Sequence, residues 1–247
     1  MDITVVIPTY NRYSLLRHAL RSVYAQTLQP KEVIVIDDGS NDNTSEIVNE
    51  FKNIIYVYQP NKGVSAARNA GIQKASSKWI AFLDSDDEWL KEKLQEQVDL
   101  HTQRDVLVSY TAERWLRNKQ EVKIPKKFRK IGKDPFLENL SYCNIAPSSV
   151  MIHKSVLKDV GVFDESLEVC EDYDLWLRIA LKYEIALINK ALVNKHAGHD
   201  EQLGFRKNLE KFRIKSLEKL LCNIDDAEKK LLVEKELEEK MIFQNRK

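Results

Sequence analysis

The first ninety residues alternate short apolar runs with segments whose apolar residues recur every three or four positions. The runs are rich in β-branched residues, as buried strands are, and the recurring positions mark one face of a helix. Asn43 to Glu46 is interpreted as a capping box that opens the second helix. The predicted strands cover residues 3–7, 33–36, 54–57 and 79–83, and the predicted helices cover residues 15–23, 47–51 and 64–75. This alternation predicts an α/β fold with a parallel, doubly wound sheet.

The pattern is less regular in the second half of the chain. A helix is expected from about Trp89, with Leu94 and Val98 on its apolar face. Further strands are predicted over residues 106–110, 148–152 and 185–188, and helices over residues 175–181, 205–221 and 227–243. We therefore expect one α/β domain over residues 1–204 and a C-terminal helical extension over residues 205–247.

Composition narrows the class of protein. A chain of 247 residues with a formal net charge of +1 lacks the broad basic field of a nucleic-acid binder. Its three cysteines are far apart, without a CxxC pair, which predicts neither a disulfide framework nor a zinc site. No apolar run is long enough to span a bilayer, and the chain enters a strand pattern at once. We expect a cytoplasmic protein without a signal peptide.

The acidic run after the fourth strand is the strongest chemical signal. Asp84, Asp86 and Asp87 follow the apolar residues 79–83 directly. Clustered carboxylates suit Mg²⁺ or Mn²⁺, which need only one or two of them when a substrate's phosphates supply the other ligands. The alternative is a solvated turn that caps the helix expected near Trp89.

Two further features lie near this run in the predicted fold. Asp37 and Asp38 end another strand of the same sheet, so they are expected at the same edge. Residues 61–71 are rich in glycine and alanine and carry Arg68 at the start of a helix. Free amides and a positive charge beside carboxylates suit a metal-bound diphosphate, whereas a surface ion pair is the alternative for Arg68.

Four motifs together resemble family 2 glycosyltransferases of the GT-A fold. They are Val-Val-Ile-Pro-Thr-Tyr-Asn-Arg at 5–12, Val-Ile-Asp-Asp-Gly-Ser at 35–40, the segment 63–71, and Leu-Asp-Ser-Asp-Asp at 83–87. They occur in that family's order across the first ninety residues, and their combination is specific. The resemblance implies a nucleotide-sugar-binding half over residues 1–100 and an acceptor side over residues 101–204.

The resemblance also implies roles for individual residues. Asp86 would coordinate the metal, with Asp87 beside it without contacting the ion. Which of Asp37 and Asp38 contacts the base stays open. The residues expected around the nucleotide are Pro8, Thr9, Tyr10, Asp37, Asp38, Arg68 and Asp84.

Two later segments extend the resemblance. Glu171-Asp172 is similar to the family's Glu-Asp motif before a helix, which implies that Asp172 is the general base and Glu171 supports it. A helix N-cap is the alternative for Asp172. Beyond the last strand the family often places a histidine that reaches the metal or the diphosphate. His196 is the first candidate and His199 the second, and Lys195 stands where an arginine is common.

The expected activity is inverting transfer of a sugar from a nucleotide-sugar, a UDP-sugar first, to an acceptor hydroxyl with Mg²⁺ or Mn²⁺. The acceptor implied by the resemblance is a glycan or a lipid-linked saccharide of a bacterial cell surface. A nucleotidyltransferase would usually carry a glycine-rich loop after the first strand, which residues 8–12 lack. A sugar-nucleotide binder without catalysis would be expected to lack Asp172 or Asp86. A dinucleotide-binding dehydrogenase would need GxGxxG after the first strand.

Basic residues along 205–221 flank an apolar stripe, and 126–130 adds further positive charge. This pattern leaves open a peripheral contact with the inner face of the membrane. The alternative is that the stripe packs on the catalytic domain.

Overall fold

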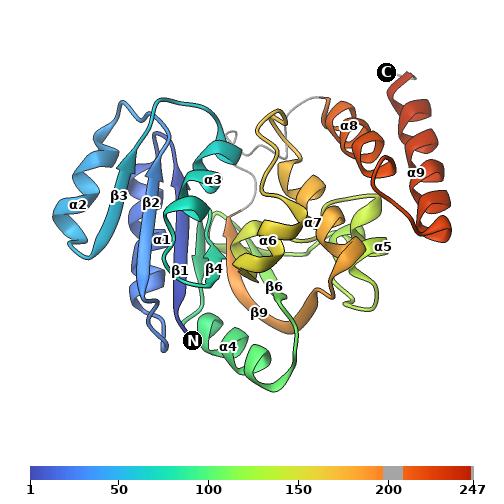
Figure 1. The fold of residues 1–247 in the computed structure, drawn as a ribbon. Coiled ribbons are helices and arrows are strands. Elements are labelled where there is room, and N and C mark those ends of the chain that lie inside the picture. Colours follow the sequence, from blue (N-terminus) through green and yellow to red (C-terminus); the bar gives the residue numbers. More distant parts are fainter. Residues whose placement is uncertain (197–207, 246–247) are drawn as a thin grey trace.

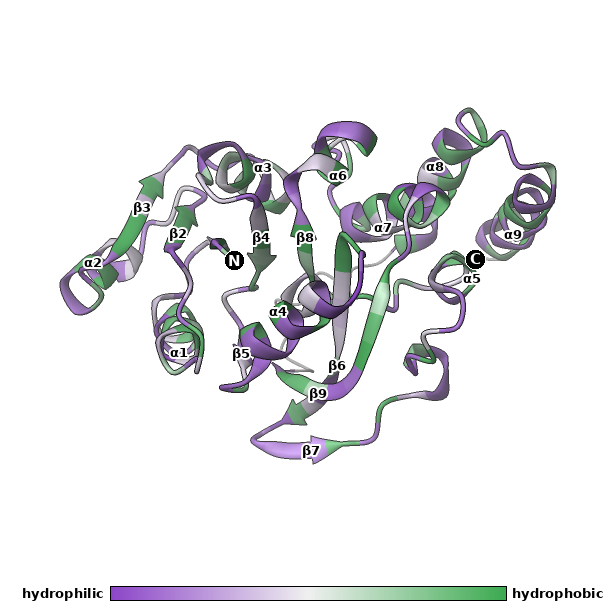
Figure 2. Cartoon of the chain, turned by 60° about the horizontal axis from the view of Figure 1, so that its bottom comes forward, coloured by the Kyte–Doolittle hydropathy of each residue, from purple (hydrophilic) through white to green (hydrophobic). Residues whose placement is uncertain are grey.

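A mixed sheet runs through the protein, with helices on both faces and a helical pair at one end (Figure 1). The computed structural model describes residues 1–196 and 208–245. In this part of the chain the sheet has nine strands in the order β3-β2-β1-β4-β8-β6-β9-β5, and β7 pairs with β6. The central strands β2, β3, β4 and β8 are largely apolar, β7 is largely hydrophilic, and the helices carry both apolar and polar residues (Figure 2).

The first four strands form the parallel half that the sequence predicts. They are β1 (Ile3–Thr9), β2 (Glu32–Asp37), β3 (Ile54–Tyr58) and β4 (Trp79–Phe82). Alternate residues of β1 face opposite sides: Val5 and Ile7 join the core under α1 (Tyr13–Tyr24), and Val6 joins the core under α3 (Val64–Lys74).

Close packing of α3 on β1 depends on Gly71. A Cβ atom built at Gly71 would lie 2.2 Å from Cγ1 of Val6, which is far inside van der Waals contact. The glycine therefore lets the helix backbone approach the strand and fixes how the segment from Gly63 onward meets the sheet edge.

The second half of the sheet is not parallel throughout. β8 (Met151–His153) runs antiparallel to both β4 and β6 (Val108–Arg117), and β6 is parallel to β9 (Ala186–His196). β5 (Asp87–Trp89) pairs antiparallel with β9, and β7 (Gln120–Val122) extends β6. The remaining helices are η1 (Asn43–Glu46), α2 (Ile47–Glu50), α4 (Lys93–Gln103), η2 (Lys126–Phe128), α5 (Pro135–Leu140), η3 (Pro147–Ser149), α6 (Lys154–Val160), α7 (Glu171–Lys182), α8 (Leu209–Leu221) and α9 (Ala227–Asn245).

Two local predictions are wrong. No helix begins at Trp89, because residues 87–89 form strand β5 and the Trp89 indole donates to the Ser148 carbonyl at 2.7 Å; α4 begins only at Lys93. The capping residue before η1 is Asp42 rather than Asn43, because the Asp42 carboxylate accepts the Thr44 N–H at 2.9 Å.

The C-terminal helices pack on α5 and α7. Leu217 and Leu220 of α8 share an apolar cluster with Tyr173 and Leu177 of α7. The part of the α8 stripe formed by Leu217 and Leu220 therefore packs on α7, as the alternative interpretation predicts. In residues 1–196 and 208–245, no helix has the length and apolar character that crossing a bilayer requires.

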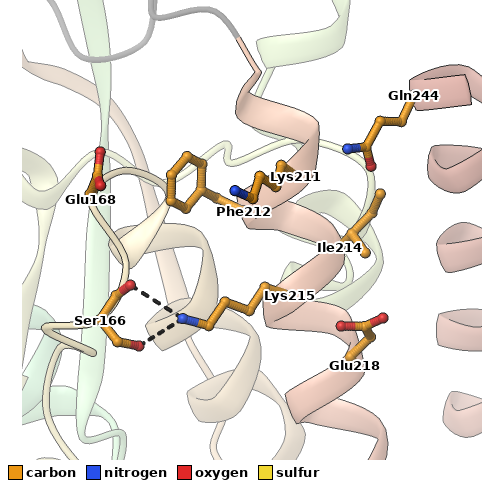
Figure 3. Close-up of a pocket in the computed structure, with 8 residues that line it drawn as sticks. All are labelled: Ser166, Glu168, Lys211, Phe212, Ile214, Lys215, Glu218 and Gln244. Atoms are coloured by element: carbon orange, nitrogen blue, oxygen red, sulfur yellow. Dashed lines mark hydrogen bonds between the residues drawn. The ribbon is translucent and has the colours of Figure 1, made fainter.

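Ion pairs reinforce this packing along the segment before α7. Lys219 of α8 contacts both Asp164 and Asp174 at 2.7 Å. One turn earlier, Lys215 donates to the Ser166 hydroxyl and carbonyl at 3.0 and 3.3 Å (Figure 3). A groove of about 410 Å³ lies beside this contact. The two lysines therefore tie α8 to the segment that leads into α7.

Candidate active site

One large cavity lies beyond the carboxyl ends of the parallel strands, where open α/β sheets bind their ligands. Its volume is about 1060 Å³, and its walls come from both halves of the sheet. Asp37 and His196 are not among its lining residues, and His199 lies outside the described residues. The sequence-predicted residues that line it are Pro8, Thr9, Tyr10, Asp38, Arg68, Asp84, Asp86, Asp87, Glu171 and Asp172.

Asp37 and Asp38, at the end of β2, differ in position and in hydrogen-bond partners. Asp37 is buried and accepts the Ser40 N–H at 2.8 Å, so it closes the turn behind the cavity wall. Asp38 lines the cavity, and its carboxylate accepts the N–H groups of Lys62 and Gly63 at 3.0 and 2.8 Å. Asp38 therefore holds the start of α3 against the cavity.

Arg68 joins the two halves of the cavity. Its guanidinium is 4% exposed and contacts Asp84 at 2.7 Å and Glu171 at 2.6 Å. Burial and the neighbouring Asp172 raise the pKa of Glu171 to about 7, although Arg68 opposes this rise. The side chain predicted to meet the diphosphate thus also links the acidic run after β4 to the start of α7.

Arg68→Met is expected to destabilise the fold by about 3–5 kcal/mol, because the buried Glu171 carboxylate would lose its ion pair with Arg68. In the variant, the folded-state pKa of Glu171 would rise further above its ordinary value of 4.5. When the pKa of a carboxyl group is higher in the folded than in the unfolded state, the free energy of unfolding falls as the pH rises above the unfolded-state pKa. The variant should therefore lose more free energy of unfolding relative to wild type near pH 8 than near pH 5. Urea unfolding at both pH values measures this. Lys74→Met, at an exposed position of the same helix, should change stability by under about 0.5 kcal/mol.

The acidic run after β4 can hold a metal only with help from a ligand. Asp86 lines the cavity and contacts Arg12 at 3.1 Å, and Asp87 is buried and accepts the Ser148 hydroxyl at 2.6 Å. Burial, with Asp86 next in effect, raises the pKa of Asp87 well above its ordinary value. Among residues 1–196 and 208–245, no three His, Cys, Asp or Glu side chains could together hold a metal ion. The carboxylates fit a site in which phosphate oxygens complete the coordination.

Asp172 lies on the opposite wall at the first turn of α7. Cys170 precedes the helix in the left-handed conformation, with φ of 63°, which turns the chain sharply before Asp172. The Asp172 carboxylate is half-buried and accepts the Tyr173 N–H at 2.7 Å. Burial, and then the charge of Asp172, raise the pKa of the Cys143 thiol, which lines the same wall. A carboxylate in this position can accept a proton from a molecule in the cavity.

The end of β9 places its residues differently from the expectation. Adjacent residues of a strand face opposite sides, so Lys195 and His196 cannot both face the cavity. Lys195 lines the cavity, whereas the His196 imidazole contacts Glu88 at 3.0 Å, and this hydrogen bond raises its pKa. Glu113 and Asp87 raise the pKa of Lys195 although burial opposes them. The alternation of side chains along a strand is the sequence signal that could have favoured Lys195 over His196 as the residue that faces the cavity.

Several lining residues have no counterpart in the sequence interpretation. Trp115 of β6, Phe128 of η2 and Arg213 of α8 all reach the cavity. They come from an irregular segment and from the helical extension, where no recognisable motif marks them.

Comparison with known proteins agrees with this geometry. The family model described as "Glycosyl transferase family 2" matches residues 4–161, more than half of the chain. An uncharacterised glycosyltransferase of Rickettsia conorii is 35% identical over 193 residues, which make up 77% of this chain and 32% of that protein. The chain thus spans about a third of the length of this relative. The Escherichia coli protein WfaP, named as a UDP-Glc:alpha-D-GlcNAc-diphosphoundecaprenol beta-1,3-glucosyltransferase, is 32% identical over 73% of this chain and 70% of its own.

Solved structures agree on the fold. Staphylococcus aureus TarS in complex with UDP-GlcNAc superposes with a TM-score of 0.79 at 22% identity, over 98% of this chain and 72% of that one. The mannosyltransferase PcManGT of Pyrobaculum calidifontis, solved with GDP-Man and Mn²⁺, gives a TM-score of 0.70 at 17% identity, over 96% and 69%. Taken with the family match and the cavity built by its motifs, these findings place the chain in glycosyltransferase family 2.

Proposed function

We propose that this enzyme transfers a sugar from a UDP-sugar to a hydroxyl of a saccharide acceptor, with inversion at the anomeric carbon. The observation that carries the proposal is that Asp84 and Asp86 share one cavity with Asp172 on the other wall. Such a cavity can hold a nucleoside diphosphate at one side and an attacking hydroxyl at the other. WfaP is named for a UDP-Glc donor, and TarS was solved with UDP-GlcNAc, which supports uridine as the base.

The donor half would hold the nucleotide and the leaving group. Pro8, Thr9, Tyr10 and Asp38 lie along the wall after β1 and β2, where we place the nucleoside. Asp86 would hold Mg²⁺ or Mn²⁺, and of the two histidine candidates only His199, outside the described residues, is kept as a further ligand. When bound, the cation supplies Lewis-acid stabilisation of the departing diphosphate.

The acceptor half would perform the proton transfer. Asp172 accepts the proton of the acceptor hydroxyl as its oxygen bonds to the anomeric carbon, and the bond from that carbon to the diphosphate oxygen breaks. One displacement from the opposite face inverts the anomeric centre. Glu171 would position Asp172 indirectly. Its ion pair with Arg68 at 2.6 Å fixes the first turn of α7, in which Asp172 is the next residue.

The acceptor is proposed to be a glycan or a lipid-linked saccharide in bacterial surface polysaccharide or glycolipid synthesis. The named acceptor of WfaP, a saccharide on diphosphoundecaprenol, supports this assignment. Work on such an acceptor would place the enzyme in the cytoplasm beside the inner face of the membrane.

Calorimetry with UDP tests the donor side. UDP is expected to bind in the micromolar to millimolar range with Mg²⁺ or Mn²⁺, and much more weakly in EDTA, because the carboxylates alone repel the diphosphate. ADP and CDP under the same conditions are the controls for the base. Screening a set of nucleotide-sugars for hydrolysis then identifies the sugar. Equal UDP affinity with metal and with EDTA would contradict a metal-dependent donor site.

A further inference from the structure

The acceptor half of the cavity has its own chemistry. The whole cavity, at about 1060 Å³, is at the upper limit of single-ligand pockets, which measure about 300–1,000 Å³. Beyond Asp172, the wall is formed by β6, η2, residues 143–147 and α8 rather than by the donor motifs. This wall therefore has room for a second substrate, and its side chains indicate which kind.

Aromatic rings form one part of this wall. Trp115 and Phe128 both line the cavity, with their ring centroids 5.5 Å apart. The Trp115 indole donates to Glu113 at 3.0 Å, which fixes the orientation of the ring. Tyr142, which is not a lining residue, lies 6.0 Å from Phe128 and supports that ring edge to face. Aromatic surface that is partly exposed in a polar cavity suits the apolar C–H face of a sugar ring.

Cations accompany the rings. The Lys127 ammonium lies 5.0 Å from the Phe128 centroid and 4.5 Å from the Tyr142 centroid, and the Arg213 guanidinium lies 5.5 Å from the Tyr142 centroid. Arg213 lines the cavity itself and also pairs with Glu210 at 2.5 Å, so a phosphate would share this guanidinium with a carboxylate. Arginine and lysine placed together are the groups that proteins use for phosphate.

The charge of the segment around η2 points the same way. Residues 119–133 contain seven lysines and arginines and a single acidic residue, Glu121. Lys130 is neutralised by Glu113 at 3.4 Å, whereas Lys127 is exposed beside the rings. The segment therefore makes the surface around Phe128 positively charged, which favours an anionic ligand on this side of the cavity.

We infer that the wall formed by Trp115, Phe128 and Arg213, with Lys127 beside it over the Phe128 ring, binds a saccharide that carries a phosphate group next to its accepting sugar. The inference rests on the proposed function, since it assigns the acceptor for the same cavity. The sugar packs on Trp115 and Phe128 within reach of Asp172, and the phosphate meets Lys127 and Arg213.

Calorimetry with two matched probes tests the inference. The protein, saturated with UDP and Mn²⁺, is titrated with a short-chain alkyl diphosphate ester of N-acetylglucosamine and with the neutral alkyl glycoside of the same sugar. The diphosphate probe should bind at least roughly tenfold more tightly, since each charge-assisted hydrogen bond contributes about 1.5–3 kcal/mol. Equal affinity for the two probes, or no saturable binding of either, would overturn the inference.

Three variants localise the effect. Lys127→Gln should weaken only the diphosphate probe, by about fivefold, as expected for one partly exposed charge. Phe128→Ala should weaken both probes. Lys123→Gln removes another exposed lysine of the same segment, four residues before the lysine that lies over the Phe128 and Tyr142 rings, and should change neither. Equal effects of Lys123→Gln and Lys127→Gln would contradict a specific subsite.

Two further measurements separate this inference from its alternatives. UDP affinity should be unchanged in all three variants, and failure of the wild type to bind UDP would contradict the proposed function instead. Each probe is therefore also titrated without UDP. Co-sedimentation with phosphatidylglycerol vesicles tests a membrane contact. If both lysine variants weaken vesicle binding and neither changes probe binding, the segment contacts the membrane and the inference is wrong.

Discussion

Asp172→Asn is expected to lower turnover by roughly 10²-fold or more, the scale of a general-base contribution, with UDP affinity unchanged. Asparagine keeps the size of the side chain and an oxygen that can still accept the Tyr173 N–H. It cannot accept the proton of an acceptor hydroxyl. Thermal stability should fall only slightly, by under about 1 kcal/mol, because the half-buried Asp172 lies in the first turn of α7 and the variant loses its charge beside the helix N-terminus. Steady-state transfer, UDP calorimetry and thermal unfolding of one preparation give the three readouts.

Glu168→Gln is the matched control for Asp172. Glu168 is an exposed carboxylate that lines the same cavity a few residues earlier in the chain, so its loss removes a similar charge without removing the proposed base. Turnover of Glu168→Gln should stay close to wild type. Near wild-type transfer by Asp172→Asn would refute the base assignment and leave the fold untouched. Loss of UDP binding in Asp172→Asn would instead show that Asp172 belongs to the donor site.

Asp86→Asn is expected to remove the metal dependence of UDP binding and to lower turnover by roughly 10²-fold or more, because the neutral amide is a poor ligand for a hard cation. Calorimetry with Mn²⁺ and with EDTA should give the same weak UDP affinity in the variant. The thermal midpoint should change little, because Asp86 is partly exposed in the cavity, 13% at its side chain.

Arg12→Gln separates the metal role of Asp86 from its ion pair with Arg12 at 3.1 Å. This variant breaks the same contact but keeps the carboxylate, so UDP binding should still be tighter with Mn²⁺ than with EDTA. If Arg12→Gln also abolishes the difference between Mn²⁺ and EDTA, the ion pair rather than a metal explains the effect at Asp86.

The donor half could be predicted from sequence because local patterns determine it. Each strand from β1 to β4 is a short apolar run, and the polar residues that follow it must appear at one sheet edge. Asp38, Arg68 and Asp84 accordingly line one cavity. The error at Trp89 has a physical reason: an acidic run before apolar residues resembles a helix start, and only pairing with β9 makes residues 87–89 a strand.

The acceptor half could not be predicted in the same way, because contacts distant in sequence build it. Trp115 and Phe128 meet only when the chain returns after β7, and Arg213 arrives from a helix nearly a hundred residues later. The antiparallel strand β8 between β4 and β6 is likewise set by pairing rather than by composition. Apart from Glu171 and Asp172, which a motif did mark, the residues of this half lack the carboxylate clusters of the donor side.

The position of α8 has a consequence for protein engineering. Leu209 and Arg213 line the cavity, and Lys219 fastens the helix to Asp164 and Asp174. A chimera that exchanges the last forty or so residues with those of another family member would therefore alter which acceptors are used while the donor preference stays with the parent. Such chimeras offer a route to new combinations of donor and acceptor. The incoming helix must carry a lysine or arginine that can pair with Asp164 and Asp174, as Lys219 does.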